Sequence, residues 1–202
     1  MNRVLSVLLF LLLLFPSALA DTEGSFTYDV QNGGAVVTAW SSEKTRLEIP
    51  ETLGGLPVRE IGARAFADSP LLSITIPASV RILRREAFSG AALYEVRFHA
   101  GLETIEARTF AGCAGLFGAA LPGTLQSIGD GAFSDCEELG YVTLPESVEQ
   151  IEGNPFAGCS RLTALPMPAD HPHFLMKDGA LISRADGHIV CVLPVQNEGG
   201  TP

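Results

Sequence analysis

The chain has 202 residues, of which 47% are hydrophobic, and a formal net charge of −10 at pH 7. This hydrophobic fraction is too high for an intrinsically disordered protein, and the negative charge argues against nucleic acid as a partner. The length suffices for a single domain with its own core.

Residues 1–20 have the composition of a secretory signal peptide. An apolar run follows Arg3 and ends at Pro16, and residues 18–20 form a small-x-small cleavage site. An uncleaved membrane anchor is the less favoured alternative, because a spanning helix needs about 20 apolar residues. We therefore expect an exported chain that begins at Asp21 and has no membrane span after cleavage.

A phenylalanine recurs at a nearly constant interval across the middle of the chain. Each one ends the same short phrase, in which an aliphatic residue is followed by four others and then Phe. The five are Phe66, Phe88, Phe110, Phe133 and Phe156, at spacings of 22, 22, 23 and 23 residues. A constant period in this range is typical of a solenoid, in which each coil buries its apolar face against its neighbours.

Other columns of the repeat share this period. Alternating apolar pairs precede a proline column, and this pattern predicts short strands with one buried face. The pairs are Leu47/Ile49, Ile74/Ile76, Val96/Phe98, Ala119/Leu121, Val142/Leu144 and Leu165/Met167. With a leading leucine, the phrase becomes L-x-x-I-x-I-P-x-x-V-x-x-I-x-x-x-A-F, the spacing of a leucine-rich repeat. Residues 45–168 are thus predicted to form a right-handed, β-rich solenoid of five full coils and one partial coil.

The fourth coil, residues 116–138, reads L-F-G-A-A-L-P-G-T-L-Q-S-I-G-D-G-A-F-S-D-C-E-E. It resembles the BspA-like (Treponema-type) leucine-rich repeat surface protein family, whose consensus is close to L-x-x-I-x-I-P-x-x-V-x-x-I-G-x-x-A-F-x-x-C. Departures are small: His99 replaces a proline, and Thr109 and Pro155 replace the Ala before Phe. The resemblance implies a bacterial protein that is secreted or held at the cell surface and is linked with adhesion and host contact.

Both flanks of the array resemble the family as well. We expect residues 21–44 to form an N-terminal capping hairpin and residues 169–194 a C-terminal one, because the end coils of a solenoid need a cover. Residues 195–202 have no apolar pattern and are expected to form a disordered tail.

Four cysteines invite a disulfide interpretation. Cys113, Cys136 and Cys159 occupy one column of the repeat, one per coil. Stacked side chains point the same way and three cannot pair evenly, so we favour buried free thiols over a disulfide between neighbouring coils. A zinc site is weaker still, because ligands on one face of a ladder do not converge on a tetrahedron. Cys191 has no assignable partner.

Residues 170–173, Asp-His-Pro-His, bring one carboxylate and two imidazoles together. We favour a polar surface connector over weak metal binding, because the spacing places no further ligand nearby. The sequence also lacks the G-x-S-x-G, H-E-x-x-H, P-loop and dinucleotide-binding motifs. No cofactor, no metal and no enzymatic activity are therefore predicted.

Charged residues are unevenly distributed. Residues 113–166 carry seven acidic side chains and one basic one, Arg161, whereas residues 45–112 carry eight of each. We favour a solvated acidic face, with a docking site for a basic partner as the alternative. In the first half, the columns place Arg81 beside Glu103 and Arg84 beside Glu106 on neighbouring coils.

The residue after each leading leucine forms a column of its own. Its first three members, Leu72, Tyr94 and Phe117, are bulky and apolar, and Tyr141 and Arg97 occupy outward strand positions nearby. Stacked coils would turn these five residues into a protein-binding patch. The alternative is that the column turns inward and extends the core.

The sequence thus predicts an exported, non-enzymatic and monomeric repeat protein. We expect a rigid surface for protein–protein interaction, with cell-surface adhesion as the role that the resemblance implies. Two alternatives remain: a structural spacer of a surface assembly with no tight ligand of its own, and a regulatory companion of a secreted hydrolase. Periplasmic, secreted and surface-attached locations are all compatible with export.

Overall fold

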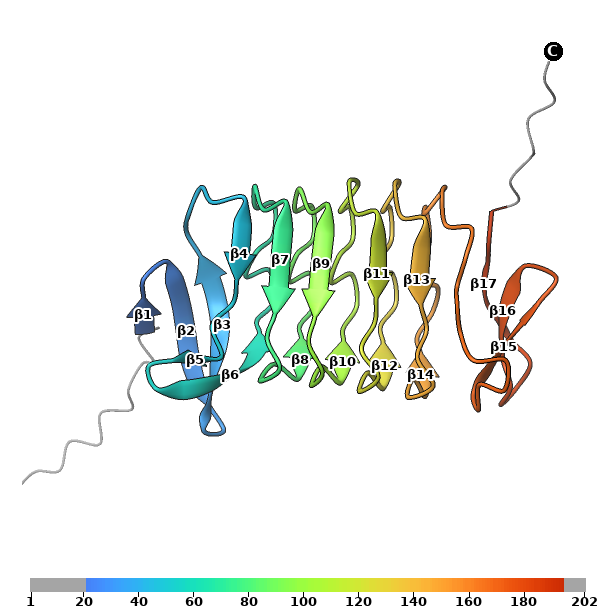
Figure 1. Ribbon diagram of the computed structural model, residues 1–202, viewed down its shortest axis with the longest axis horizontal. Helices are drawn as coiled ribbons and strands as arrows, with labels where there is room; N and C mark the ends of the chain where they lie inside the picture. Colours follow the sequence, from blue (N-terminus) through green and yellow to red (C-terminus); the bar gives the residue numbers. More distant parts are fainter. Residues whose placement is uncertain (1–20, 195–202) are drawn as a thin grey trace, which may run out of the picture.

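The repeats wind into a solenoid whose coils stack along one long axis (Figure 1). This computed structural model describes residues 21–194, so the predicted signal peptide at 1–20 and the predicted tail at 195–202 lie outside the described residues. Between residues 21 and 194 the regular elements are strands, and no helix there is long and apolar enough to cross a membrane. The predicted β-solenoid with coils of 22–23 residues is confirmed.

The first strand of each coil lies on one long side of the solenoid. These strands are β4 (Arg46–Glu48), β7 (Ser73–Ile76), β9 (Glu95–Phe98), β11 (Gly118–Ala120) and β13 (Tyr141–Thr143). Neighbours run parallel, with Ile74 of β7 opposite Val96 of β9. The apolar pairs point inward as predicted, since Ile74 and Ile76 are buried while Ser73 and Thr75 remain partly exposed.

The second strand of each coil forms another parallel ladder. It contains β6 (Leu56–Ile61), β8 (Ile82–Leu83), β10 (Thr104–Ile105), β12 (Ser127–Ile128) and β14 (Gln150–Ile151), with β5 (Thr52–Leu53) paired to β6. Most of these strands have two residues, because each coil must turn again within a few residues. They supply the second aliphatic column of the core, which includes the fully buried Leu83, Ile105 and Ile128.

The phenylalanine column forms a continuous stack inside the solenoid. Successive rings from Phe66 to Phe156 have centroids 5.1, 5.2, 5.2 and 5.9 Å apart, with interplanar angles of at most 23°. All five are buried. Such pairs add about 0.5–1.5 kcal/mol each beyond their buried area, so the column ties each coil to the next.

The first long side is divided where the repeat lengthens. Four residues separate the buried phenylalanine from the next leading leucine between Phe88 and Leu93, and five separate them between Phe110 and Leu116. The longer link first appears with Cys113, and β11 pairs with β13 but not with β9. The interruption therefore coincides with the extra residue.

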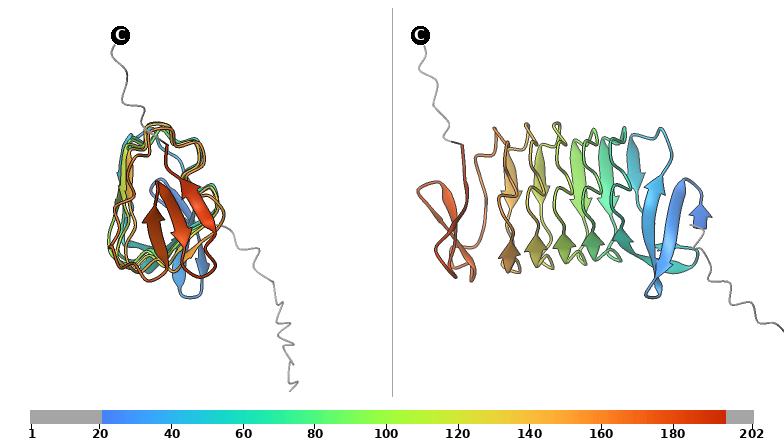
Figure 2. Two further views of the ribbon diagram at one scale, coloured as in Figure 1. Left: turned by 90° about the vertical axis from the view of Figure 1, so that its right-hand side faces the viewer. Right: turned by 180° about the vertical axis from the view of Figure 1, so that it is seen from behind.

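Antiparallel sheets lie at the two ends of the stack. At one end, β1 (Asp21–Glu23), β2 (Phe26–Gln31) and β3 (Gly34–Trp40) join the second ladder through β3 and β6. At the other end, β15 (Phe174–Lys177), β16 (Ala180–Ser183) and β17 (Ile189–Val192) form a separate sheet across the last coil (Figure 2). Residues 169–194 thus contain three strands, one more than a hairpin.

Candidate protein-interaction surface

The column after the leading leucines is built by a chain of backbone hydrogen bonds. Tyr94 N donates to Leu72 O at 2.8 Å, Phe117 N donates to Tyr94 O at 3.3 Å, and Gly140 N donates to Phe117 O at 2.9 Å. Each member therefore lies directly beside its equivalent on the next coil. This spacing brings the three large side chains, 22 or 23 residues apart in sequence, into one row.

These side chains face solvent. The exposed fractions are 46% for Leu72, 63% for Tyr94, 56% for Phe117 and 39% for Tyr141. We call these four residues the strand-face patch. The alternative interpretation, in which the column turns inward and extends the core, is wrong, because the preceding residue of each coil, such as Leu93 and Leu116, already fills the core position.

Tyr141 joins the patch by leaning over the neighbouring coil. Its ring lies edge-on to Phe117, with centroids 6.3 Å apart and an interplanar angle of 80°. It crosses Gly118, where an added Cβ would come within 2.4 Å of the tyrosine ring. A glycine at position 118 is therefore what allows the two rings to meet.

The role of Gly118 was not apparent from the sequence. The sequence did contain one indication of this contact. Gly118 occupies an outward strand position, and the equivalent position on the next coil is Tyr141. The sequence pattern assigns both residues to the outward face, but it does not specify in which direction the tyrosine leans.

Arg97 lies on the same side of the solenoid, on β9. Its side chain is 68% exposed, and Nε is 2.8 Å from Oε1 of Glu95. The hydrogen bond from Arg97, and a further one from the Ser73 hydroxyl, lower the pKa of the Glu95 carboxyl. Tyrosine, phenylalanine and arginine on one rigid side are the residue types that dominate protein–protein binding energy.

The second ladder carries the ion pairs predicted from the columns. Arg84 Nη1 lies 2.8 Å from Glu106 Oε1, and Arg81 Nη1 lies 3.6 Å from Glu103 Oε1. Arg84 also contacts Glu60 on the preceding coil, with Nε 2.7 Å from Oε2. These partly exposed pairs contribute little to stability individually, and they neutralise the charge on this side of the first half.

All four cysteines are free and buried. The cysteine thiols of the repeat donate hydrogen bonds of 3.0–3.2 Å to backbone carbonyl oxygens of the phenylalanine column. The pairs are Cys113 with Phe88, Cys136 with Phe110, and Cys159 with Phe133. Burial raises the pKa of Cys113 to about 12. A thiol that stays protonated is a poor nucleophile, so Cys113 serves the core.

His171 has a structural position. It is 1% exposed, and its Nε2 lies 3.0 Å from Pro145 O, while Nδ1 accepts hydrogen bonds from the backbone N–H groups of His173 and Phe174. The surface interpretation of residues 170–173 is therefore wrong for His171, which anchors the last coil to β15. Among residues 21–194, no three His, Cys, Asp or Glu side chains are grouped to hold a metal ion.

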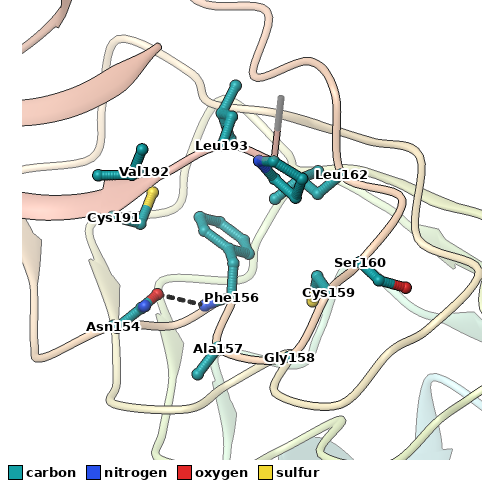
Figure 3. A pocket seen from close by; sticks show the side chains of 11 residues that line it. Asn154, Phe156, Ala157, Gly158, Cys159, Ser160, Leu162, Cys191, Val192 and Leu193 are labelled. Atoms are coloured by element: carbon teal, nitrogen blue, oxygen red, sulfur yellow. Dashed lines mark hydrogen bonds between the residues drawn. The ribbon is translucent and has the colours of Figure 1, made fainter. Parts of the chain in front are cut away.

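A small pocket lies between the last coil and β17. Its volume is about 220 Å³, and its lining includes Phe156, Cys159 and Cys191. Figure 3 shows the Phe156 ring between the coil and β17, with Cys191 on the β17 side. This volume is below that of typical ligand sites, so the pocket is a packing gap at the joint.

These features define a leucine-rich repeat protein, and the sequence comparison identifies its family. The BspA type leucine rich repeat region matches residues 59–174 in six copies. The matched range is more than half of the chain, and the chain belongs to this family. No curated protein sequence matches the chain.

Several solved structures share the fold. The crystal structure of a Treponema pallidum leucine-rich repeat protein is 32% identical, with a TM-score of 0.67, and the match covers 68% of this chain and 66% of that one. A Bacteroides ovatus leucine-rich repeat protein is 28% identical, with a TM-score of 0.65 over 73% of this chain and 41% of that one. The pneumococcal vaccine antigen PcpA, at 23% identity, 83% and 54% coverage and a TM-score of 0.64, shows likeness of fold alone. This chain thus spans less than two thirds of each of these proteins.

Proposed function

We propose that the protein is an exported, non-enzymatic binding protein whose strand-face patch, together with Arg97, contacts another protein. The observation that carries this proposal is the exposure of Tyr94 and Phe117, at 63% and 56%, on neighbouring coils. Contiguous exposed aromatic side chains are costly in a soluble protein and mark interaction sites.

The scaffold beneath the patch favours tight binding. The backbones of Leu72, Tyr94 and Phe117 are hydrogen-bonded from coil to coil, and their coils are stacked on the buried phenylalanine column. A partner therefore meets side chains on a rigid backbone and loses little backbone entropy on binding. Tyrosine and phenylalanine have few rotatable bonds, which limits the remaining cost.

Export and a bacterial surface location belong to the same proposal. They are supported by the signal-like sequence of residues 1–20 and by membership of the BspA-type family. In this proposal the β1–β3 and β15–β17 sheets cap a monomeric array, since each covers one end of the stack (Figure 2). Adhesion is the biological role that fits an exposed patch on such a scaffold.

Surface plasmon resonance against a panel of purified extracellular proteins tests the proposal. A Tyr94→Ala/Phe117→Ser double variant should lose at least about a hundredfold in affinity, because paired hot-spot residues contribute several kcal/mol. Circular dichroism should show the same fold for both forms. Equal and negligible binding by both would instead favour the structural spacer.

A second variant tests the patch without removing an aromatic group. Gly118→Ala places a methyl group where the Tyr141 ring lies and should displace that ring from Phe117. Gly140→Ala is the matched control, because its Cβ would have one ordinary contact, 3.7 Å from Phe117 O. Affinity should fall for Gly118→Ala and stay close to the parent value for Gly140→Ala.

A further inference from the structure

The first strand of the array has an open edge. In the sheet β4-β7-β9, β4 lies at the end, and within residues 21–194 it pairs with β7 alone. Ser73 N donates to Thr45 O at 3.1 Å and Ile49 N donates to Thr75 O at 3.2 Å. In a parallel ladder this alternation directs the backbone N–H and C=O groups of Arg46 and Glu48 toward the open side. Unpaired groups of this kind form a template for another strand.

A groove of mixed polarity runs beside this edge. Its volume is about 310 Å³, and its apolar lining comes from Phe26, Trp40, Leu47, Pro50 and Leu53. Glu23 and Lys44 add one charge of each sign to the lining. The Trp40 ring packs against Phe66, the first ring of the buried phenylalanine column, with ring centroids 5.8 Å apart. The floor of the groove is therefore continuous with the core.

The projecting end sheet leaves room beside β4 for a single extended segment but not for a second folded solenoid. The β1–β3 sheet projects beyond β4 toward the N-terminal end of the stack (Figure 1). A second folded solenoid that continued the β4 sheet would have to occupy the space of this projecting sheet. A single extended segment needs only the edge of β4 and the groove.

The charges of β4 indicate the order of charged residues in the bound segment. Arg46 and Glu48 are exposed, and neither side chain forms a salt bridge within residues 21–194. In an antiparallel pair centred on Leu47, an acidic residue would lie opposite Arg46 and a basic one opposite Glu48. The residue between them would lie opposite Leu47, on the groove side. Read from its N-terminus, the segment is basic, apolar and acidic.

We propose that the outer edge of β4 binds an extended basic–apolar–acidic segment of a partner protein by antiparallel strand addition, with the apolar side chain in the groove. Four backbone hydrogen bonds would form, two at Arg46 and two at Glu48, because opposite residues in a hydrogen-bonded antiparallel pair exchange both bonds. This site is separate from the strand-face patch.

The chain contains both a probe and a reporter for this site. Residues 45–49, Thr-Arg-Leu-Glu-Ile, have the required order of charges, so the acetylated and amidated peptide of this sequence is the probe. Trp40 is the single tryptophan of the protein and lines the groove. Titration of the full chain with the peptide should give a saturable change in tryptophan emission. No change at millimolar peptide would overturn the proposal.

N-methylated peptides distinguish strand addition from nonspecific apolar binding. Methylation of the arginine nitrogen removes a donor that faces Glu48 and should weaken binding at least about tenfold, the equivalent of one hydrogen bond. Methylation of the leucine nitrogen, which faces away from β4, is the matched control and should bind as the parent peptide does. Equal binding of both methylated peptides would contradict strand addition.

Variants of the protein complete the test. Arg46→Pro removes an outward N–H from an edge strand, a position that tolerates proline, and should abolish the response, whereas Arg46→Ala keeps the N–H and should weaken it only a few-fold. The Tyr94→Ala/Phe117→Ser variant should bind the peptide unchanged, so failure of the patch and of the edge can be told apart. A dimer in sedimentation that Arg46→Pro abolishes would assign the edge to a second copy and overturn the peptide assignment.

Discussion

Two columns of large apolar side chains run along this solenoid at the same period, one buried and one exposed. The column from Phe66 to Phe156 is buried and continues through five coils. The outer column of Leu72, Tyr94 and Phe117 is exposed and ends at Gly140, where Tyr141 takes over from a different position. The sequence period therefore predicts which residues stack on neighbouring coils. The position of a residue within its coil determines whether that stack is buried and stabilises the fold or is exposed and available for binding.

The largest effect should come from breaking the inner column. Phe110 stacks between Phe88 and Phe133, and Phe98 approaches it edge-on at 6.1 Å. Phe110→Ala leaves a cavity in the middle of the ladder and should lower the free energy of unfolding by about 3–5 kcal/mol. Urea denaturation followed by circular dichroism measures this change. A loss below about 1 kcal/mol would show that the stack does not hold the coils together.

Cys113, beside the inner column, predicts a loss of stability at alkaline pH. The pKa of Cys113 is about 12 in the folded protein and near 9.0 when unperturbed. The unfolded chain therefore releases this proton first, so stability is complete below pH 9 and falls between pH 9 and 12. The Cys113 thiol contributes about 1.4 kcal/mol per pH unit in this window.

Cys113→Ala isolates this contribution. Ala91 occupies the equivalent position on the preceding coil and is also buried, so alanine suits the site. Denaturation series between pH 8 and 11 should show a shallower decline for the variant than for the parent protein. Parallel declines would show that Cys113 does not titrate in this way.

The turn before each buried phenylalanine contains backbone strain that can be relieved. Arg108 has a φ of 58°, in the left-handed region, and the equivalent residue on the next coil is Gly131, with a φ of 60°. The left-handed conformation costs a non-glycine residue about 1–2 kcal/mol, partly offset by the flexibility of glycine in the unfolded chain. Arg108→Gly should therefore raise the free energy of unfolding by up to about 1 kcal/mol in urea denaturation. A decrease would mean that the side chain contributes more than the strain costs.

The smallest effect on stability should come from the outer column. Phe117→Ala removes an exposed ring that makes an edge-on aromatic contact with Tyr141. We expect the free energy of unfolding to change by about 0.5 kcal/mol or less, in contrast to Phe110→Ala in the preceding coil. A large loss would show that the outer column also stabilises the fold.

Much of the fold could be predicted because the repeat constrains each position several times over. The strand pairs, the buried phenylalanines and the Arg84–Glu106 contact all follow from placing residues of one column on adjacent coils. Prediction failed where the repeat stops. His171 was expected at the surface and is buried against Pro145, and residues 169–194 form three strands. In these segments no neighbouring coil supplies the equivalent position, so long-range contacts decide the conformation.

The sequence by itself determined the period, the inward columns and the order of coils, because a fixed spacing can bury its apolar residues only when equivalent positions stack. It also determined which residues enter the outer column. Only the tertiary structure decided that this column faces solvent, that Tyr141 crosses Gly118 to reach Phe117, and that β4 keeps an open edge beside Trp40. These outcomes depend on side-chain direction and on where the end sheets lie, and neither is encoded in a spacing.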